Sequence, residues 1–136
     1  MAYTNQQLMD LAVKARENAY VPYSGFRVGA CLLAKSGKVY LGCNVENSAY
    51  GPTNCAERTA FFKAISEGER EFEKIAIVGG KQNDISDLVA PCGVCRQVMA
   101  EFCSEDFVLI LGNPKNIKEF KLNQILPLAF TPKDLE

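Results

Sequence analysis

The feature that most constrains this chain is a pair of short cysteine-containing stretches, Cys55-Ala56-Glu57-Arg58 and Pro91-Cys92-Gly93-Val94-Cys95. They supply three thiols and one carboxylate, each within a residue or two of a predicted helix start. Three thiolates can hold a zinc ion and leave its fourth tetrahedral position open, as in catalytic zinc sites. A fold that uses all three thiols on one ion has to bring two helix N-termini together.

The composition narrows the chemistry further. The chain has no histidine, which removes every mechanism that depends on a histidine base or metal ligand. Any metal must then be held by thiolates and carboxylates, and any general acid or base must be a carboxylate, Lys, Tyr or Cys. Six cysteines without an export signal indicate a reducing compartment, where disulfides are rare.

Length and charge limit the partners that we expect. A chain of 136 residues predicts a single catalytic domain spanning 1–136. The formal net charge is -1 and no Lys/Arg cluster stands out, so nucleic acid is not an expected partner. No apolar run approaches the ~20 residues that a membrane span needs. We therefore expect no membrane partner and a cytoplasmic location.

The apolar pattern alternates between helical and strand periods along the chain. The helices are expected at 5–19, 53–66 and 93–102, and the strands at 26–34, 39–41, 74–79 and 107–111. A weak strand ending at Phe120 and one helical turn before Pro127 are expected after them. This order predicts an α/β fold with three α/β/α layers, in which a mixed five-stranded sheet carries helices on both faces.

The cysteines allow more than one interpretation before any family is considered. A Cys-x-x-Cys in an α/β protein can be a redox dithiol. A closed structural zinc site would need a fourth thiol, for which Cys31, Cys43 and Cys103 are candidates. Cys31 lies within a predicted strand and Cys103 at the far end of a predicted helix, so we expect both to be buried core residues. Cys43 stays open as a fourth ligand.

Cys55-Ala56-Glu57 followed by Pro91-Cys92-Gly93-Val94-Cys95 resembles the C-A-E…P-C-x-x-C signature of zinc-dependent nucleoside deaminases in its three-cysteine variant. The likeness continues in four further stretches: Pro22-Tyr23-Ser24, Phe26 to Ala30, Gly42 to Asn47, and Leu126-Pro127. It covers nearly the whole chain. The sequence is similar to the small homotetrameric cytidine deaminases, whose fold has the layers predicted above.

The resemblance implies hydrolysis of cytidine and 2′-deoxycytidine to uridine and 2′-deoxyuridine with release of ammonia, for pyrimidine salvage. Zinc, about one ion per chain, would be held by Cys55, Cys92 and Cys95 and would polarise a water. Glu57 would carry protons from that water to N3 and to the departing amino group. Arg58 would offset the negative charge of a site with three thiolates.

Four residues are implied to bind the nucleoside. Asn44 and Glu46 would hold the ribose, Phe26 would stack near the pyrimidine, and the backbone around Ala56 would read the edge of the cytosine ring. The residues alone leave plainer roles open. Asn44 and Glu46 can serve as polar groups that make turn hydrogen bonds, and Phe26 as a core side chain at a strand end.

Two aromatic residues, Tyr50 and Phe130, resemble side chains that this family supplies across the subunit interfaces of a homotetramer. Two alternative functions remain. A deaminase of the blasticidin-S type shares the zinc motif, but that family lacks the glutamate corresponding to Glu46. A non-catalytic zinc module would need a fourth protein ligand and would not need Glu57.

Overall fold

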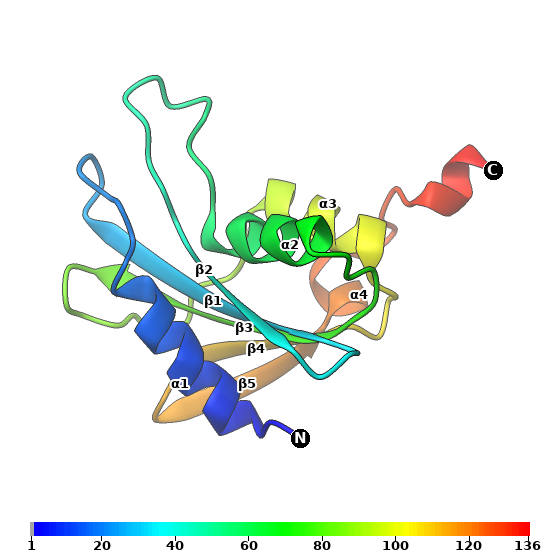
Figure 1. Ribbon diagram of the computed structural model, residues 1–136, viewed down its shortest axis with the longest axis horizontal. Helices are drawn as coiled ribbons and strands as arrows, with labels where there is room; N and C mark the ends of the chain where they lie inside the picture. Colours follow the sequence, from blue (N-terminus) through cyan, green and yellow to red (C-terminus); the bar gives the residue numbers. More distant parts are fainter. Residues whose placement is uncertain (1) are drawn as a thin grey trace.

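The computed structural model describes residues 2–136 and has a twisted five-stranded sheet with helices on both faces (Figure 1). The strand order is β2-β1-β3-β4-β5. The strands are β1 (Phe26–Ala34), β2 (Val39–Cys43), β3 (Phe72–Lys81), β4 (Val108–Asn113) and β5 (Asn116–Lys121). Only β3 and β4 pair in parallel, and the other neighbours are antiparallel. The predicted mixed sheet is confirmed.

Helix α1 (Asn5–Arg16) covers one face of the sheet (Figure 1). Thr4 begins it with a capping box: its hydroxyl accepts from the Gln7 N–H at 3.1 Å, while the Gln7 side chain accepts from the Thr4 N–H at 2.9 Å. The apolar face of the helix is buried against the sheet; its members are Leu8, Met9, Ala12 and Ala15.

Helices α2 (Ala56–Ser66) and α3 (Gly93–Phe102) lie on the opposite face (Figure 1). Because side chains alternate along a strand, β1 feeds both layers: Leu32 packs with α2 and α3, whereas Leu33 packs with α1. A short α4 (Leu122–Ile125) follows β5. No helix within residues 2–136 has both the length and the apolar composition that crossing a membrane requires.

Two glycines let the helices approach the sheet closely. A Cβ on Gly29 of β1 would lie 2.6 Å from the backbone nitrogen of Arg16 in α1. A Cβ on Gly42 of β2 would lie 2.6 Å from the backbone nitrogen of Ala60 in α2. Only glycine fits at such contacts. The first turn of α2 is therefore seated directly on β2.

Arg16 is a buried cation, 6% exposed, that fastens α1 to the end of β3. Its Nη2 donates to three backbone carbonyl oxygens, at 2.9 Å to Gly80, 3.0 Å to Gln82 and 2.8 Å to Asp84. A planar guanidinium can serve several acceptors at once, which is how a buried charge is tolerated here. Arg16 thereby orders the start of the loop that leads to Pro91.

The start of α2 differs from the prediction. The sequence predicted a helix over 53–66, but α2 begins at Ala56 with Cys55 as its N-cap residue. Asn54 is not available as a cap because its backbone pairs with Val45, through hydrogen bonds of 2.9 and 3.0 Å. This bridge closes the loop between β2 and α2 and sets where Cys55 leaves it.

Candidate active site

Three cysteine sulfurs meet where α2 and α3 begin. The Sγ atoms of Cys55, Cys92 and Cys95 all lie within 4.8 Å of one another, and those of Cys55 and Cys92 are 3.7 Å apart. Cys95 is fully buried, whereas Cys92 is exposed. Within residues 2–136 this is the one group of three or more Cys, Asp or Glu side chains placed to share a metal ion. Spacing suggested this set without proving it, and the fold brings the three sulfurs together.

The helix starts explain why these thiols are free to bind a metal. Cys55 and Cys92 are both N-cap residues with extended backbone, at ψ of 156° and 169°. Neither side chain makes a capping hydrogen bond to its own helix. The unpaired N–H groups and the dipole of each helix favour negative charge at this end. The helix N-termini therefore favour the thiolate forms of Cys55 and Cys92.

Arg58 lies one turn into α2 and faces the sulfurs. Its Nη2 donates to Cys55 Sγ at 3.3 Å, while its Nε is buried without a hydrogen-bond partner among the described residues. Hydrogen bonds from Cys95 and then Arg58 lower the pKa of Cys55 to about 5. The same contact with Cys55, together with burial, raises the pKa of Cys95. A metal cation must therefore displace the proton that Cys95 holds.

The environment of Glu57 disfavours its charged form, whereas that of Cys55 favours the charged thiolate. Its side chain is 4% exposed, so the first-turn glutamate is not the solvated surface residue that its position alone allowed. Burial raises the pKa of the Glu57 carboxyl to about 7, and the nearby Cys55 charge acts in the same direction. A carboxyl group that can hold or release a proton near neutrality is suited to general acid–base chemistry.

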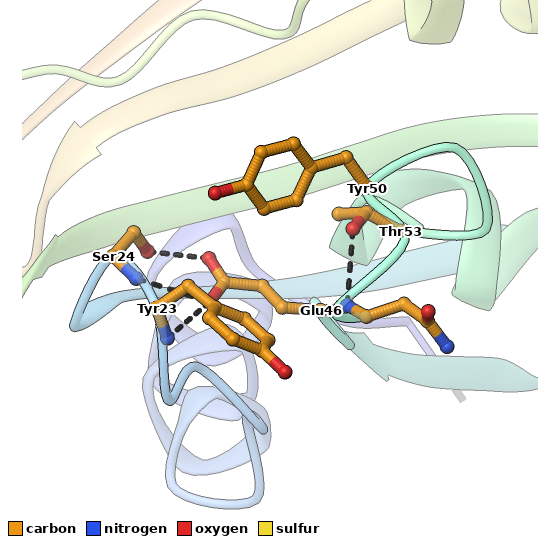
Figure 2. A pocket seen from close by; sticks show the side chains of 6 residues that line it. Tyr23, Ser24, Glu46, Tyr50 and Thr53 are labelled. Carbon is orange, nitrogen blue, oxygen red and sulfur yellow. Dashed lines mark hydrogen bonds between the residues drawn. The ribbon is translucent and has the colours of Figure 1, made fainter.

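A cavity of about 400 Å³ opens beside Glu46, between the loop before β1 and the loop after β2. Figure 2 shows the Glu46 carboxylate pointing at Ser24 and at the backbone of Tyr23, with the Tyr50 ring on the other side. The N–H groups of Tyr23 and Ser24 donate to Oε1 at 3.0 and 3.1 Å, and the Ser24 hydroxyl donates to Oε2. These bonds, first that of the hydroxyl, lower the pKa of Glu46.

Asn44 and Phe26 are not among the residues that line this cavity, and their contacts are with the start of β1. The Asn44 side chain accepts from the Val28 N–H at 2.9 Å and donates to the Phe26 carbonyl at 2.8 Å. Asn44 thus fixes the start of β1, where Phe26 is half-buried. The Ser24 hydroxyl also accepts from the Phe26 N–H at 3.0 Å, which ties Phe26 to Glu46.

The chain can now be compared with known proteins. A family model for the cytidine and deoxycytidylate deaminase zinc-binding region matches residues 2–111. The chain belongs to the cytidine deaminase family. A cytidine deaminase of Sporosarcina psychrophila is 53% identical over 131 residues, which is 96% of this chain and 93% of that protein.

Two further relatives are a solved cytidine deaminase and a more distant protein with a different name. A crystal structure of a cytidine deaminase from Burkholderia pseudomallei has a TM-score of 0.87 and 46% identity, and the match covers 94% of this chain and 100% of that one. A blasticidin-S deaminase of Bacillus cereus is 31% identical over 133 residues, 93% of this chain and 94% of that protein. The three-layer α/β/α fold predicted from the order of helices and strands is confirmed.

The three cysteine sulfurs fit the zinc ion that the matched family region is described as binding. Two thiolates at 2.3 Å from one tetrahedral zinc lie about 3.8 Å apart, close to the separation between Cys55 and Cys92. The donor set has three sulfurs and compensation from Arg58, and Cys31, Cys43 and Cys103 lie outside it. One zinc per chain with an open fourth position is the arrangement that these residues support.

The sequence pattern did not indicate which residues hold the Glu46 carboxylate. Tyr23 and Ser24 were noted only as part of a family stretch, yet their N–H groups and the Ser24 hydroxyl provide all three hydrogen bonds to the carboxylate. A turn before β1 contains small polar residues for many reasons, so its composition gave no signal. The contact between Glu46 and these two residues forms only when the two loops lie side by side in the fold.

The roles predicted for Ala56, Tyr50 and Phe130 stay predictions, because none of the described contacts tests them. Ala56 is fully buried at the first position of α2, beside Glu57. Tyr50 and Phe130 are 73% and 59% exposed, and Tyr50 adopts a left-handed φ of 61°. The Tyr23 and Tyr50 rings meet edge to face with centroids 6.2 Å apart, at the mouth of the cavity.

Proposed function

We propose that the protein hydrolyses cytidine and 2′-deoxycytidine to uridine and 2′-deoxyuridine with release of ammonia. The observation that carries this proposal is Glu57, a buried carboxyl that is electrostatically coupled to Cys55 and Cys95. Cys55, Cys92 and Cys95 would hold zinc, which when bound would supply the Lewis acidity that makes water a nucleophile at neutral pH. A structural zinc clip would not require a proton carrier at this position.

In this mechanism Glu57 moves every proton. Its carboxylate takes a proton from the attacking water and delivers it to N3 of the cytosine ring while C4 gains the oxygen. It then takes the second proton from the new hydroxyl group on C4 and delivers it to the amino group, so that the C4 carbonyl forms and the amino group leaves as ammonia. The balance is one water consumed and one ammonia released. Arg58 holds the Cys55 sulfur in place during these steps, and the buried setting of Glu57 keeps bulk water from competing for its proton.

We propose that the cavity beside Glu46 receives the sugar. A carboxylate fixed by Tyr23 and Ser24 is a directed acceptor for vicinal hydroxyl groups, which suits a nucleoside better than a free base. Phe26 and the Ala56 backbone then face the pyrimidine, while Asn44 keeps Phe26 in place. The blasticidin-S alternative is supported by more distant similarity and does not account for Glu46.

The decisive test compares the wild type with Glu57→Gln by following cytidine in the ultraviolet, with zinc measured in the same samples. Glutamine keeps the size of the side chain but cannot carry a proton. Turnover should fall by roughly 10³-fold or more. Zinc content should stay near one ion per chain.

The matched control is Glu67→Gln, which changes an exposed glutamate at the other end of α2. This control should turn over cytidine like the wild type. Equal rates for Glu57→Gln and the wild type would reject a catalytic role. Turnover of blasticidin S in preference to cytidine would select the alternative deaminase.

We further propose that residues 1–136 form a single catalytic domain that assembles as a cytoplasmic homotetramer and acts in pyrimidine salvage. Exposed apolar side chains, among them Tyr50, Leu128 and Phe130, support subunit contacts next to the site. Sedimentation velocity run at the concentrations used for activity tests the assembly. Full activity in a sample that sediments as a monomer would contradict shared sites.

A further inference from the structure

Arg96 follows the zinc ligand Cys95 directly and reaches back along the start of α3. Its Nε donates to the Pro91 carbonyl at 2.8 Å, and its Nη1 donates to the Ile125 carbonyl at 2.6 Å. The Pro91 carbonyl is joined by one peptide bond to Cys92. One guanidinium therefore connects the backbone next to a zinc ligand to the end of α4.

The turn from Pro91 to Cys95 is held at two points. The Pro91 ring is fully buried, and its carbonyl is bound by Arg96. Ile125 is the last residue of α4, where carbonyl groups lack partners within their own helix. Arg96 gives one of these carbonyls a charged donor, so α4 becomes a fixed anchor for the turn.

The position of the Arg96 charge, in the first turn of α3, is a second observation that relates this residue to the metal site. A cation in the first turn of a helix is opposed by the helix dipole, and α3 has no acidic residue in its first turn to offset it. Three thiolates around Zn²⁺ leave a net charge of -1, which favours a nearby cation. The planar fork of arginine also suits two carbonyls at once, whereas lysine offers a single charged centre.

We propose that Arg96 is a positioning residue for zinc: it joins the Pro91 and Ile125 carbonyls and so holds Cys92 and Cys95 in their ligand geometry. The inference concerns how the metal is retained and does not depend on which nucleoside is the substrate. The next residue strengthens it, because Gln97 Nε2 donates to the Phe130 carbonyl at 2.7 Å and fastens the following segment to the same helix.

The test measures the rate at which zinc-loaded protein transfers its metal to a chromophoric chelator. Arg96→Met keeps much of the side-chain length but removes both hydrogen bonds, and should release zinc at least about tenfold faster than the wild type. Arg96→Lys keeps the charge and one bond, and should be intermediate. Arg70→Met is the control, because Arg70 also bridges two carbonyls, those of Ile65 and Glu69, at the far end of α2.

A second readout separates positioning from general stability. Replacing a residue that only stabilises the fold lowers the Tm of the zinc-free and the zinc-loaded protein equally. The rise in Tm on adding zinc then stays unchanged. Arg96→Met should shrink that rise, and Arg70→Met should not. Wild-type release rates together with an unchanged rise for Arg96→Met would overturn the proposal. If Arg96→Met does not fold, Arg96→Lys decides: faster release supports the proposal, and wild-type release overturns it.

Discussion

At the scale of single residues, the first turn of α2 produces two opposite environments within three positions. Cys55 is stabilised as a thiolate by hydrogen bonds and by the helix N-terminus, whereas Glu57 is buried so that its charged form is disfavoured. Arg58 faces the sulfur and not open solvent. A metal ligand and a proton carrier can therefore be neighbours without sharing the same electrostatics.

Glu46 should remain ionised to lower pH than an ordinary glutamate. Its pKa lies below the ordinary value of 4.5, chiefly because the Ser24 hydroxyl donates to it. A lowered folded-state pKa gives stability that is present above 4.5 and lost as the pH falls through the lower value. Nucleoside binding that uses this carboxylate should follow the same dependence.

Ser24→Ala should therefore weaken uridine binding at a higher pH than in the wild type, and isothermal titration from pH 7 downward measures this. Ser36→Ala is the matched control, since the Ser36 hydroxyl donates to Glu69 at 2.6 Å away from the cavity. Identical pH profiles for Ser24→Ala and the wild type would contradict a role for the Ser24 contact in keeping Glu46 charged.

Residue type and spacing indicated a metal site at two helix starts, but the full set of site residues came from the family resemblance. With six cysteines and no histidine, Cys43 stayed open as a fourth ligand before folding, whereas the structure groups Cys55, Cys92 and Cys95 and leaves Cys43 outside. Asn44 and Glu46 looked equivalent because both are polar and alternate after a strand. In the structure Asn44 bonds the backbone of β1, and Glu46 alone of the two points into the cavity.

At the scale of elements, the close contact between α2 and β2 determines how near the first turn of α2, which carries Glu57, lies to the sheet. Gly42 contacts the backbone of Ala56 and Ala60, so any side chain there pushes the first turn of α2 off the sheet. Gly42→Ala should lower the free energy of unfolding by about 2 kcal/mol or more. Zinc retention should fall as well, because Cys55 moves with the helix.

Urea unfolding of the zinc-free protein and the zinc content after dialysis measure both effects of Gly42→Ala. The control is Gly93→Ala, at the first position of α3, where an added Cβ meets nothing within 4 Å. There alanine should be neutral or slightly stabilising, because it restricts the unfolded chain. Should Gly42→Ala unfold at the same urea concentration as the wild type, the close contact would not be a constraint.

Helix periodicity located α3 correctly but does not give its rotation about its own axis. The apolar residue Val94 is 57% exposed. The buried face of α3 runs through Cys95 and Met99, four residues apart, and Val94 precedes that face by one position. The requirement to bury the metal ligand Cys95 fixes the rotation of the helix, and an apolar pattern without the metal site does not contain that information.

At the scale of the whole molecule, the order of helices and strands was sufficient to predict the layers. A strand, helix and strand at 72–113 gave the parallel pair β3 and β4, and the hairpin at 26–43 supplied antiparallel neighbours. The loops were not predictable to the same degree. The cavity depends on the loop before β1 meeting the loop after β2, through the bridge between Tyr20 and Val45, and no local pattern encodes that contact.

Zinc should be a large part of the stability of the whole fold, because its ligands join two helices that start 37 positions apart in the sequence, at Ala56 and Gly93. A ligand present at about 1,000 times its Kd stabilises the folded state by ~4 kcal/mol. At about 3 °C per kcal/mol for a chain of this size, chelation should lower Tm by roughly 12 °C. Calorimetry before and after chelation measures the difference. The Tm of Cys92→Ala should equal that of the chelated wild type and should not rise when zinc is added. The Tm of Cys103→Ala, whose sulfur lies outside the group, should still rise.

A chelated wild type with unchanged Tm would mean that the two helix starts are held by packing alone, and that the metal serves chemistry without stabilising the fold.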